Sequence, residues 1–296
     1  MGSCDYDVPD YTVMAAETHR SSALIRNNSI ALVALDLDGT LMGSDLQISA
    51  RVVRAIRAVQ QQDVTVTLAT GRMFSATLPF ARYLGISTPL ICYQGGWIQA
   101  ADSEILHRDV LPQSVAQSAV ALAHEHQWHT VVYVNGKIII EALRYPKTFY
   151  DQLLGPDAMI NPDLESVLQS HCADKILFVA EPEAIPAIAR YLIPHCAGKA
   201  EVVQSHNLFI EIVPKSVNKG RALAWLAARL HIPQQAVLAI GDQENDVPML
   251  TWAGVGIAMG NAIPAARQVA DWTAPTLAED GAAVALERFI LDGSVP

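Results

Sequence analysis

The stretch ALVALDLDGTL, residues 31–41, decides the fold of this chain. Residues 31–35 are all apolar, which is typical of a strand buried on both faces of a sheet. Asp36 and Asp38 follow directly, and then Gly39 and Thr40. Neighbouring carboxylates repel each other and are costly to remove from water. Two of them at the end of a buried strand therefore need a compensating cation.

Beyond residue 41, apolar runs that resemble this strand alternate along the chain with stretches of helical periodicity. Continuous apolar strands that alternate with helices favour a parallel sheet covered on both faces, so we expect an α/β fold with a Rossmann-like, doubly wound core. Further strands are expected at 63–71, 89–93, 236–242 and 254–260, and helices after an N-cap at Ser49, near 74–84, at 221–230 and after Pro248.

Residues 112–213 have a different organisation. Helices expected at 112–128, 146–154 and 183–193 are mixed with strands such as HTVVYV and KIII, which flank an Asn135-Gly136 turn typical of a hairpin. A loop is expected between residue 154 and the strand DKILFVA. This region is interpreted as an α+β module inserted into a core made of residues 30–111 and 214–296.

Composition limits the class of protein. Of the 296 residues, 51% are hydrophobic and 17% charged, which is typical of a globular protein. The net charge of −10 disfavours binding to nucleic acid polymers or anionic membranes, and no apolar run approaches the ~20 residues of a membrane span. The four cysteines form no C-x-x-C pair, and we interpret them as reduced thiols of a cytoplasmic protein.

Residues 1–29 differ from the rest. They are polar and lack clear periodicity, and YDVPDY at 6–11 matches the core of the haemagglutinin epitope tag. We interpret the segment as a tag-like or disordered extension and exclude it from the fold prediction.

Polar residues follow several of the predicted strands. Thr70, Gly71 and Arg72 end one strand, and GDQEND at 241–246 ends another. Ligands of open α/β sheets bind beyond the carboxyl ends of the strands, so these groups should meet Asp36 and Asp38 at one site. Several carboxylates with a hydroxyl and the ammonium of Lys219 suit Mg²⁺ and a phosphate. One carboxylate can attack phosphorus and a second can transfer protons.

With these motifs the chain resembles the haloacid dehalogenase superfamily phosphatases, in the Cof-type branch with a large α/β cap. The resemblance covers roughly residues 30–292. DxDGT alone is short, but its combination, in order, with GDxxNDxxML is highly specific. The motifs are DLDGT at 36–40, ATGR at 69–72, the lysine of VNKGRAL at 217–223 and GDQENDVPML at 241–250, with supporting matches in AMGNA at 258–262 and EDGAAVAL at 279–286.

The resemblance implies a role for each acid. Asp36 would attack the phosphate and be phosphorylated transiently. Asp38 would protonate the leaving oxygen and then activate water. Mg²⁺ would be bound by the carboxylates of Asp36 and Asp242 and by the backbone carbonyl of Asp38. Asp246 would support the metal site or orient Lys219.

The resemblance also implies how the phosphate is held and what the inserted module does. The module, as a cap, would fold over the site and select the organic part of the substrate. The groups that would bind the phosphoryl oxygens are Thr70, Lys219, Asn245 and the backbone amides of Leu37 and Gly71.

We therefore expect a Mg²⁺-dependent phosphatase that hydrolyses small phosphorylated metabolites, such as sugar phosphates, nucleotides or phosphorylated cofactors, through an aspartyl-phosphate. One alternative is a phosphosugar mutase, which the hydrolase-like GDQENDVPML disfavours. Another is a non-catalytic metabolite-binding or regulatory protein, although both acids of DLDGT remain.

Some of these residues also have structural interpretations. The hydroxyl of Thr70 could cap the next turn, and Asp242, Asn245 and Asp246 could be N-cap residues of the helix after Pro248. Arg72 is interpreted as a structural contact near the site. The family pattern Tyr-Asn-Gly is here Tyr-Gln-Gly-Gly at 93–96, which leaves open what Gln94 contacts.

Overall fold

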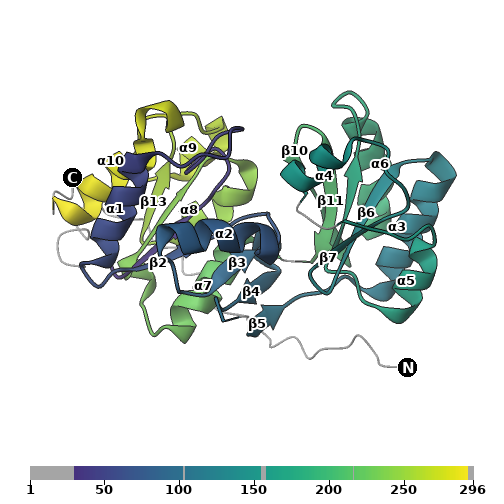
Figure 1. Ribbon diagram of the computed structural model, residues 1–296, viewed down its shortest axis with the longest axis horizontal. Helices are drawn as coiled ribbons and strands as arrows, with labels where there is room; N and C mark the ends of the chain where they lie inside the picture. The colour runs from purple at the N-terminus through teal and green to yellow at the C-terminus, as the bar shows by residue number, and fades with distance from the viewer. Residues whose placement is uncertain (1–29, 103, 155–157, 216, 293–296) are drawn as a thin grey trace.

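The computed structural model describes residues 30–102, 104–154, 158–215 and 217–292. Two bodies lie side by side, one built around the parallel sheet and one around a second, larger sheet (Figure 1). The extension predicted at 1–29 lies outside the described residues.

The core sheet has five parallel strands in the order β14-β13-β12-β1-β2. β1 lies between β12 and β2, with each of its residues 0% exposed, because helices cover both faces. This confirms the predicted α/β class with a doubly wound core. The strands are β1 (Leu32–Leu35), β2 (Thr65–Leu68), β12 (Val237–Gly241), β13 (Val255–Ala258) and β14 (Trp272–Thr273).

The strand order places a topological switch point beside β1. The chain runs from β1 to β2 on one side, and β12 later pairs with β1 on the other side. Open α/β sheets bind ligands at such a point, beyond the carboxyl ends of the strands. The helices around the sheet are α1 (Ala50–Gln60), α2 (Phe74–Leu84), α7 (Lys219–Arg229), α8 (Val247–Trp252), α9 (Pro264–Val269) and α10 (Gly281–Leu286).

Local signals place two of these helices as predicted. Ser49 is the N-cap of α1, and its hydroxyl oxygen accepts a hydrogen bond from the amide of Val52 at 3.2 Å. α2 spans residues 74–84, as predicted, and ends at Gly85, whose left-handed conformation (φ 71°) suits glycine.

The strand predicted at 89–93 is expected to join the parallel sheet, but the structure places it in a different sheet. Ile91 of β3 (Leu90–Cys92) forms an isolated parallel bridge with Ala69, the residue after β2. β3 itself begins a three-stranded antiparallel sheet with β4 (Trp97–Gln99) and β5 (Ile105–Arg108). Three consecutive left-handed residues, Tyr93, Gln94 and Gly95, reverse the chain after β3. A turn this short allows only antiparallel pairing with the next strand.

The inserted region forms a six-stranded sheet in the order β10-β11-β9-β6-β7-β8. Asn135 and Gly136 have left-handed conformations (φ 52° and 70°) and join β6 to β7 in a two-residue hairpin, as predicted. The limits of the insert at 112 and 213 stay predictions. The strands are β6 (His129–Val134), β7 (Lys137–Ile140), β8 (Met159–Ile160), β9 (Lys175–Val179), β10 (Ala200–His206) and β11 (Phe209–Pro214).

Helices cover this sheet unequally. α3 (Gln113–His126), α5 (Leu164–Ser170) and α6 (Ile185–Cys196) share one apolar cluster with the sheet residues Val132 and Phe178. α4 (Lys147–Leu153) packs on the opposite side, where buried Tyr150 joins the cluster of the core. This second face is the one turned toward the core (Figure 1).

Two expectations need correction. The segment predicted as a loop after residue 154 contains β8, which pairs with β7, and α5. Asp163 begins α5 by accepting a hydrogen bond from the amide of Ser166 at 2.9 Å. Cys92 and Cys196 are buried free thiols as expected, but half-buried Cys172 is disulfide-bonded, so the prediction of four reduced thiols is wrong there. Among the described residues, no helix is long and apolar enough to cross a membrane.

Candidate active site

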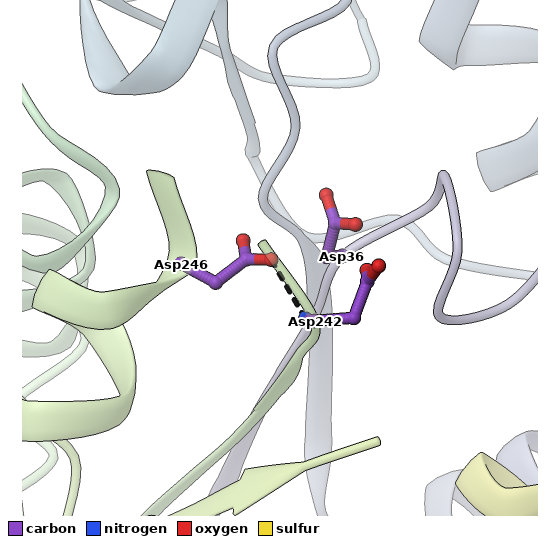
Figure 2. Close-up of side chains that lie close together, drawn as sticks. All are labelled: Asp36, Asp242 and Asp246. Atoms are coloured by element: carbon purple, nitrogen blue, oxygen red, sulfur yellow. Dashed lines mark hydrogen bonds between the residues drawn. The ribbon is translucent and has the colours of Figure 1, made fainter. Parts of the chain in front are cut away.

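Three carboxylates meet at the switch point. Asp36 follows β1 and Asp242 follows β12, and the amide of Asp36 donates to the carbonyl of Ile240 at 3.1 Å. Oxygen atoms of Asp36, Asp242 and Asp246 all lie within 4.8 Å of one another (Figure 2). The three residues are at most 4% exposed. Segments about two hundred residues apart therefore build one buried acidic cluster.

Lys219 supplies the cation of this cluster. It is the first residue of α7 and 0% exposed. Its Nζ lies 2.6 Å from Oδ1 of Asp36 and 2.6 Å from Oδ1 of Asp246. Burial alone would lower the pKa of this ammonium, but the two carboxylates raise it above its ordinary value, so Lys219 stays charged. The start of a helix disfavours a cation, and the carboxylates of Asp36 and Asp246 compensate for this at Lys219.

Asp246 is fixed from two sides. Its Oδ2 accepts hydrogen bonds from the backbone amides of Asp242 at 2.8 Å and Gln243 at 2.9 Å, and its Oδ1 accepts from Lys219 (Figure 2 shows the first of these). The side chain of Asp246 closes the capping box of the short turn at Glu244–Asp246. It makes no capping hydrogen bond to the helix after Pro248, so the N-cap interpretation is wrong there. Its contact with Lys219 is consistent with the expected role of orienting that lysine.

The cluster carries more negative charge than Lys219 neutralises. Burial, and then the charge of Asp246, raises the pKa of Asp242 to about 6. Burial also raises the pKa of Asp36 well above its ordinary value, and Asp246 adds to the effect while Lys219 opposes it. Carboxylate oxygens gathered with excess charge are a donor set that suits a hard divalent cation. Asp36 and Asp242 fit the metal-binding role expected of them.

Magnesium should stabilise the protein more at high pH than at low pH. In the metal-free protein Asp242 keeps its proton up to pH about 6, against 3.8 for an ordinary aspartate. The folded state then binds more protons than the unfolded state between these values, so the free energy of unfolding falls as pH rises, by about 3 kcal/mol for this group. A bound cation replaces the proton and reverses that loss.

The measurement is thermal unfolding with and without excess Mg²⁺ at about pH 5 and about pH 7.5. We expect the increase in Tm to be at least about twofold larger at the higher pH. Asp242→Asn is the control and should reduce this pH dependence, leaving the part that comes from Asp36. An increase that is equal or larger at low pH contradicts the prediction.

The residues after Asp38 make room for Asp242. Gly39 has φ +86°, and a Cβ atom there would lie 2.3 Å from Oδ2 of Asp242. The hydroxyl of Thr40 donates to Oδ1 of Asp242 at 3.0 Å. Asn261, from the AMGNA match, donates to the carbonyl of Gly39 at 2.9 Å. The glycine and threonine of DLDGT thus position Asp242, which follows a different strand.

Asp38 lies at the same strand end but its carboxylate does not join the buried cluster. Nε and Nη2 of Arg72 each donate to it at 2.7 Å, and its side chain is 50% exposed. Arg72 therefore has a specific partner in the site. The two acids of DLDGT have different environments, one buried against a lysine and one half-exposed against an arginine.

Further donors lie in the residues that follow the neighbouring strands β1 and β2. The hydroxyl oxygen of buried Thr70 accepts a hydrogen bond from the amide of Arg72 at 3.1 Å, so its own proton is left to donate elsewhere. Within the described part of the chain, the amides of Leu37 and Gly71 donate to no protein acceptor. Such free donors can bind phosphate oxygens.

Gln94 connects two of the predicted motifs. Its Oε1 accepts a hydrogen bond from Nδ2 of Asn245 at 2.8 Å, and its Nε2 lies 2.4 Å from where a Cβ of Gly71 would be. The side chain of Gln94, which is longer than the asparagine of the family pattern, therefore fills the space beside Gly71 and binds Asn245. Asn245 keeps one N–H for a ligand.

Three contributors to the site were not predicted from the sequence in these roles. Thr40 and Gln243 both donate to the carboxylate of Asp242, Gln243 at 2.8 Å to Oδ2, and Arg72 holds Asp38. Thr40 and Arg72 stand inside predicted motifs, so their position was a usable signal, whereas nothing in the sequence indicates the orientation of Gln243.

The fold is of the doubly wound α/β class with an inserted α+β module, and its candidate site lies at the switch point of the parallel sheet. The chain belongs to the haloacid dehalogenase-like hydrolase family, whose sequence pattern matches residues 33–286. The predicted resemblance is thereby confirmed.

Named relatives point the same way. A Bacillus subtilis 5-amino-6-(5-phospho-D-ribitylamino)uracil phosphatase is 28% identical over 270 residues, covering 87% of this chain and 97% of the relative. An Enterobacter HMP-PP phosphatase is 30% identical over 240 residues, covering 79% and 85%. The crystal structure of a haloacid dehalogenase-like hydrolase from Bacteroides thetaiotaomicron has a TM-score of 0.80 and 30% identity, covering 88% and 100%. The prediction of an enzyme is confirmed, and these names are consistent with a phosphoric monoester hydrolase.

Proposed function

We propose that the protein is a Mg²⁺-dependent phosphatase of small phosphorylated metabolites that works through an aspartyl-phosphate on Asp36. The observation that carries the proposal is the buried cluster of Asp36, Asp242, Asp246 and Lys219 beside the donors of Thr70 and of the two backbone amides. Family membership and the phosphatase names of the relatives support it.

The two acids of DLDGT divide the chemistry. Asp36 is the nucleophile, and Lys219 at 2.6 Å favours its ionised form. Asp38 is the general acid for the leaving oxygen and then the general base for water. Its carboxylate accepts two hydrogen bonds from Arg72 and is half-exposed, so a leaving group and a water molecule can reach it.

The remaining residues hold the phosphoryl group and the cation. Asp36, Asp242 and the backbone carbonyl of Asp38 would hold Mg²⁺, which when bound neutralises negative charge on the phosphoryl oxygens. Lys219 and Asp246 keep the nucleophile oriented. The phosphoryl oxygens would be bound by Thr70, Lys219, Asn245 and the amides of Leu37 and Gly71. Positioned donors and charge are what phosphoryl transfer needs.

The substrate is proposed as a small phosphorylated metabolite, with the inserted module as the cap that contacts its organic part. Sugar phosphates, nucleotides and phosphorylated cofactors form the panel to be tested, together with the substrate that the name of the Bacillus relative gives. A cytoplasmic site of action is supported by the two buried free thiols, with the disulfide-bonded Cys172 as the exception.

Hydrolysis of an aryl phosphate with and without EDTA tests the proposal. We expect turnover in Mg²⁺ that falls by about 10²-fold or more when the metal is removed, and that returns when Mg²⁺ is added back. Turnover that is indifferent to EDTA contradicts the metal requirement, and tight binding of phosphate esters without turnover contradicts the enzymatic function.

A further inference from the structure

Lys175 is a buried cation of the inserted module that the proposed chemistry does not use. It begins β9 and is 4% exposed. Its Nζ lies 2.7 Å from Oε2 of Glu211, on the neighbouring strand β11. It also lies over two aromatic rings, Tyr133 of the same sheet at 4.7 Å and Tyr93 of the core at 5.5 Å. This ammonium therefore sits where the module meets the core.

The same ammonium reaches the loop of the candidate active site. Nζ of Lys175 donates to the carbonyl oxygen of Gly71 at 3.4 Å. The preceding residue, Asp174, is also held by the core, because Nε of Arg108 donates to its Oδ1 at 2.7 Å. The start of β9 is thus fastened to the core at two successive residues.

A continuous path of hydrogen bonds leads from Lys175 to Thr70. The carbonyl of Gly71 and the amide N–H of Arg72 belong to one peptide group. That N–H donates to the hydroxyl oxygen of Thr70 at 3.1 Å. A charge on the carbonyl end polarises the peptide and strengthens the bond at its N–H end, because hydrogen bonds in series reinforce each other. The hydroxyl of Thr70 then becomes a stronger hydrogen-bond donor, and its orientation is fixed.

We propose that Lys175, held by Glu211, is a positioning residue that prepares the Thr70 hydroxyl to donate to the phosphoryl group. The inference rests on the proposed phosphatase function and adds a residue of the inserted module to its phosphate site. It also explains why a lysine and a glutamate are kept buried at the junction, where a pair of apolar residues would avoid the cost of desolvating two charges.

A double-mutant cycle with Thr70→Val tests the path. Lys175→Met is combined with Glu211→Gln, because removing the lysine alone would leave the buried carboxylate of Glu211 without this cation. We expect this pair of changes to lower kcat for an aryl phosphate by about tenfold in the wild-type background and by less than about twofold beside Thr70→Val. Lys147→Met, which removes an exposed lysine paired with Asp151 at 2.7 Å, is the matched control and should change kcat little.

The same cycle is measured by calorimetric binding of inorganic phosphate in Mg²⁺, which requires no turnover. We expect the paired change at Lys175 and Glu211 to raise the dissociation constant of phosphate in the wild-type background and to change it much less beside Thr70→Val. Equal losses with and without Thr70→Val, in variants that keep their Tm, show that Lys175 only packs the junction and overturn the inference. If the wild type binds phosphate but does not hydrolyse esters, the proposed function fails while the binding cycle still decides the inference. Should the first pair not fold, Lys175→Gln with Glu211→Gln replaces it.

Discussion

Asp36→Asn is expected to lower kcat by at least about 10⁴-fold, because the neutral amide cannot attack phosphorus. No phosphoenzyme should form either. The change is nearly isosteric and Lys219 keeps its bond to Asp246, so the protein should stay folded. The measurements are initial rates with an aryl phosphate and the intact mass of acid-quenched enzyme. Asp45→Asn, at an exposed aspartate close in sequence, is the matched control.

Asp38→Asn should behave differently. It removes a proton donor and acceptor but not the nucleophile, so kcat should fall by about 10²–10⁴-fold for alkyl phosphates. The loss should be smaller for aryl phosphates, whose leaving groups need little protonation. A series of substrates with graded leaving-group pKa values measures this dependence. Equal losses for the two variants across the whole series would contradict the division of roles between Asp36 and Asp38.

Lys219→Met is expected to cost both activity and stability. It leaves Asp36, Asp242 and Asp246 buried together without a cation, and breaking a buried ion pair from one side costs about 3–5 kcal/mol. Urea unfolding of the metal-free protein measures this loss of unfolding free energy. Lys215→Met, at an exposed lysine four residues earlier, should change the stability by no more than about 0.5 kcal/mol.

A second substitution tests whether the loss of stability in Lys219→Met comes from charge repulsion or from lost packing. Adding Asp246→Asn removes one of the unpaired charges while an amide oxygen can still accept the hydrogen bonds from the backbone of Asp242 and Gln243. The double variant should therefore be more stable than Lys219→Met alone, although it should remain inactive. If the second change makes the protein less stable, electrostatic repulsion is not the cause of the loss.

Local pattern was sufficient for much of the fold and the site. The apolar run at 31–35, the cap at Ser49 and the Asn135-Gly136 turn report burial and backbone conformation within a few residues, and the structure has these features as predicted. The acidic and polar strand ends could be expected to meet because parallel strands end at one edge of the sheet. Asp36 and Asp242 do so.

Other features depend on contacts that no local pattern contains. The sequence by itself determined the α/β class, the strand that carries Asp36 and Asp38, and the acids and lysine that gather at its end. Only the tertiary structure decided that the carboxylate of Asp38 turns to Arg72, that Gln94 holds Asn245, and that Lys175 reaches Gly71 across about a hundred residues. Periodicity indicates which side chains are buried, whereas the choice of partner for a buried polar group is made by the packing of distant segments, because each such group needs a partner once water is excluded.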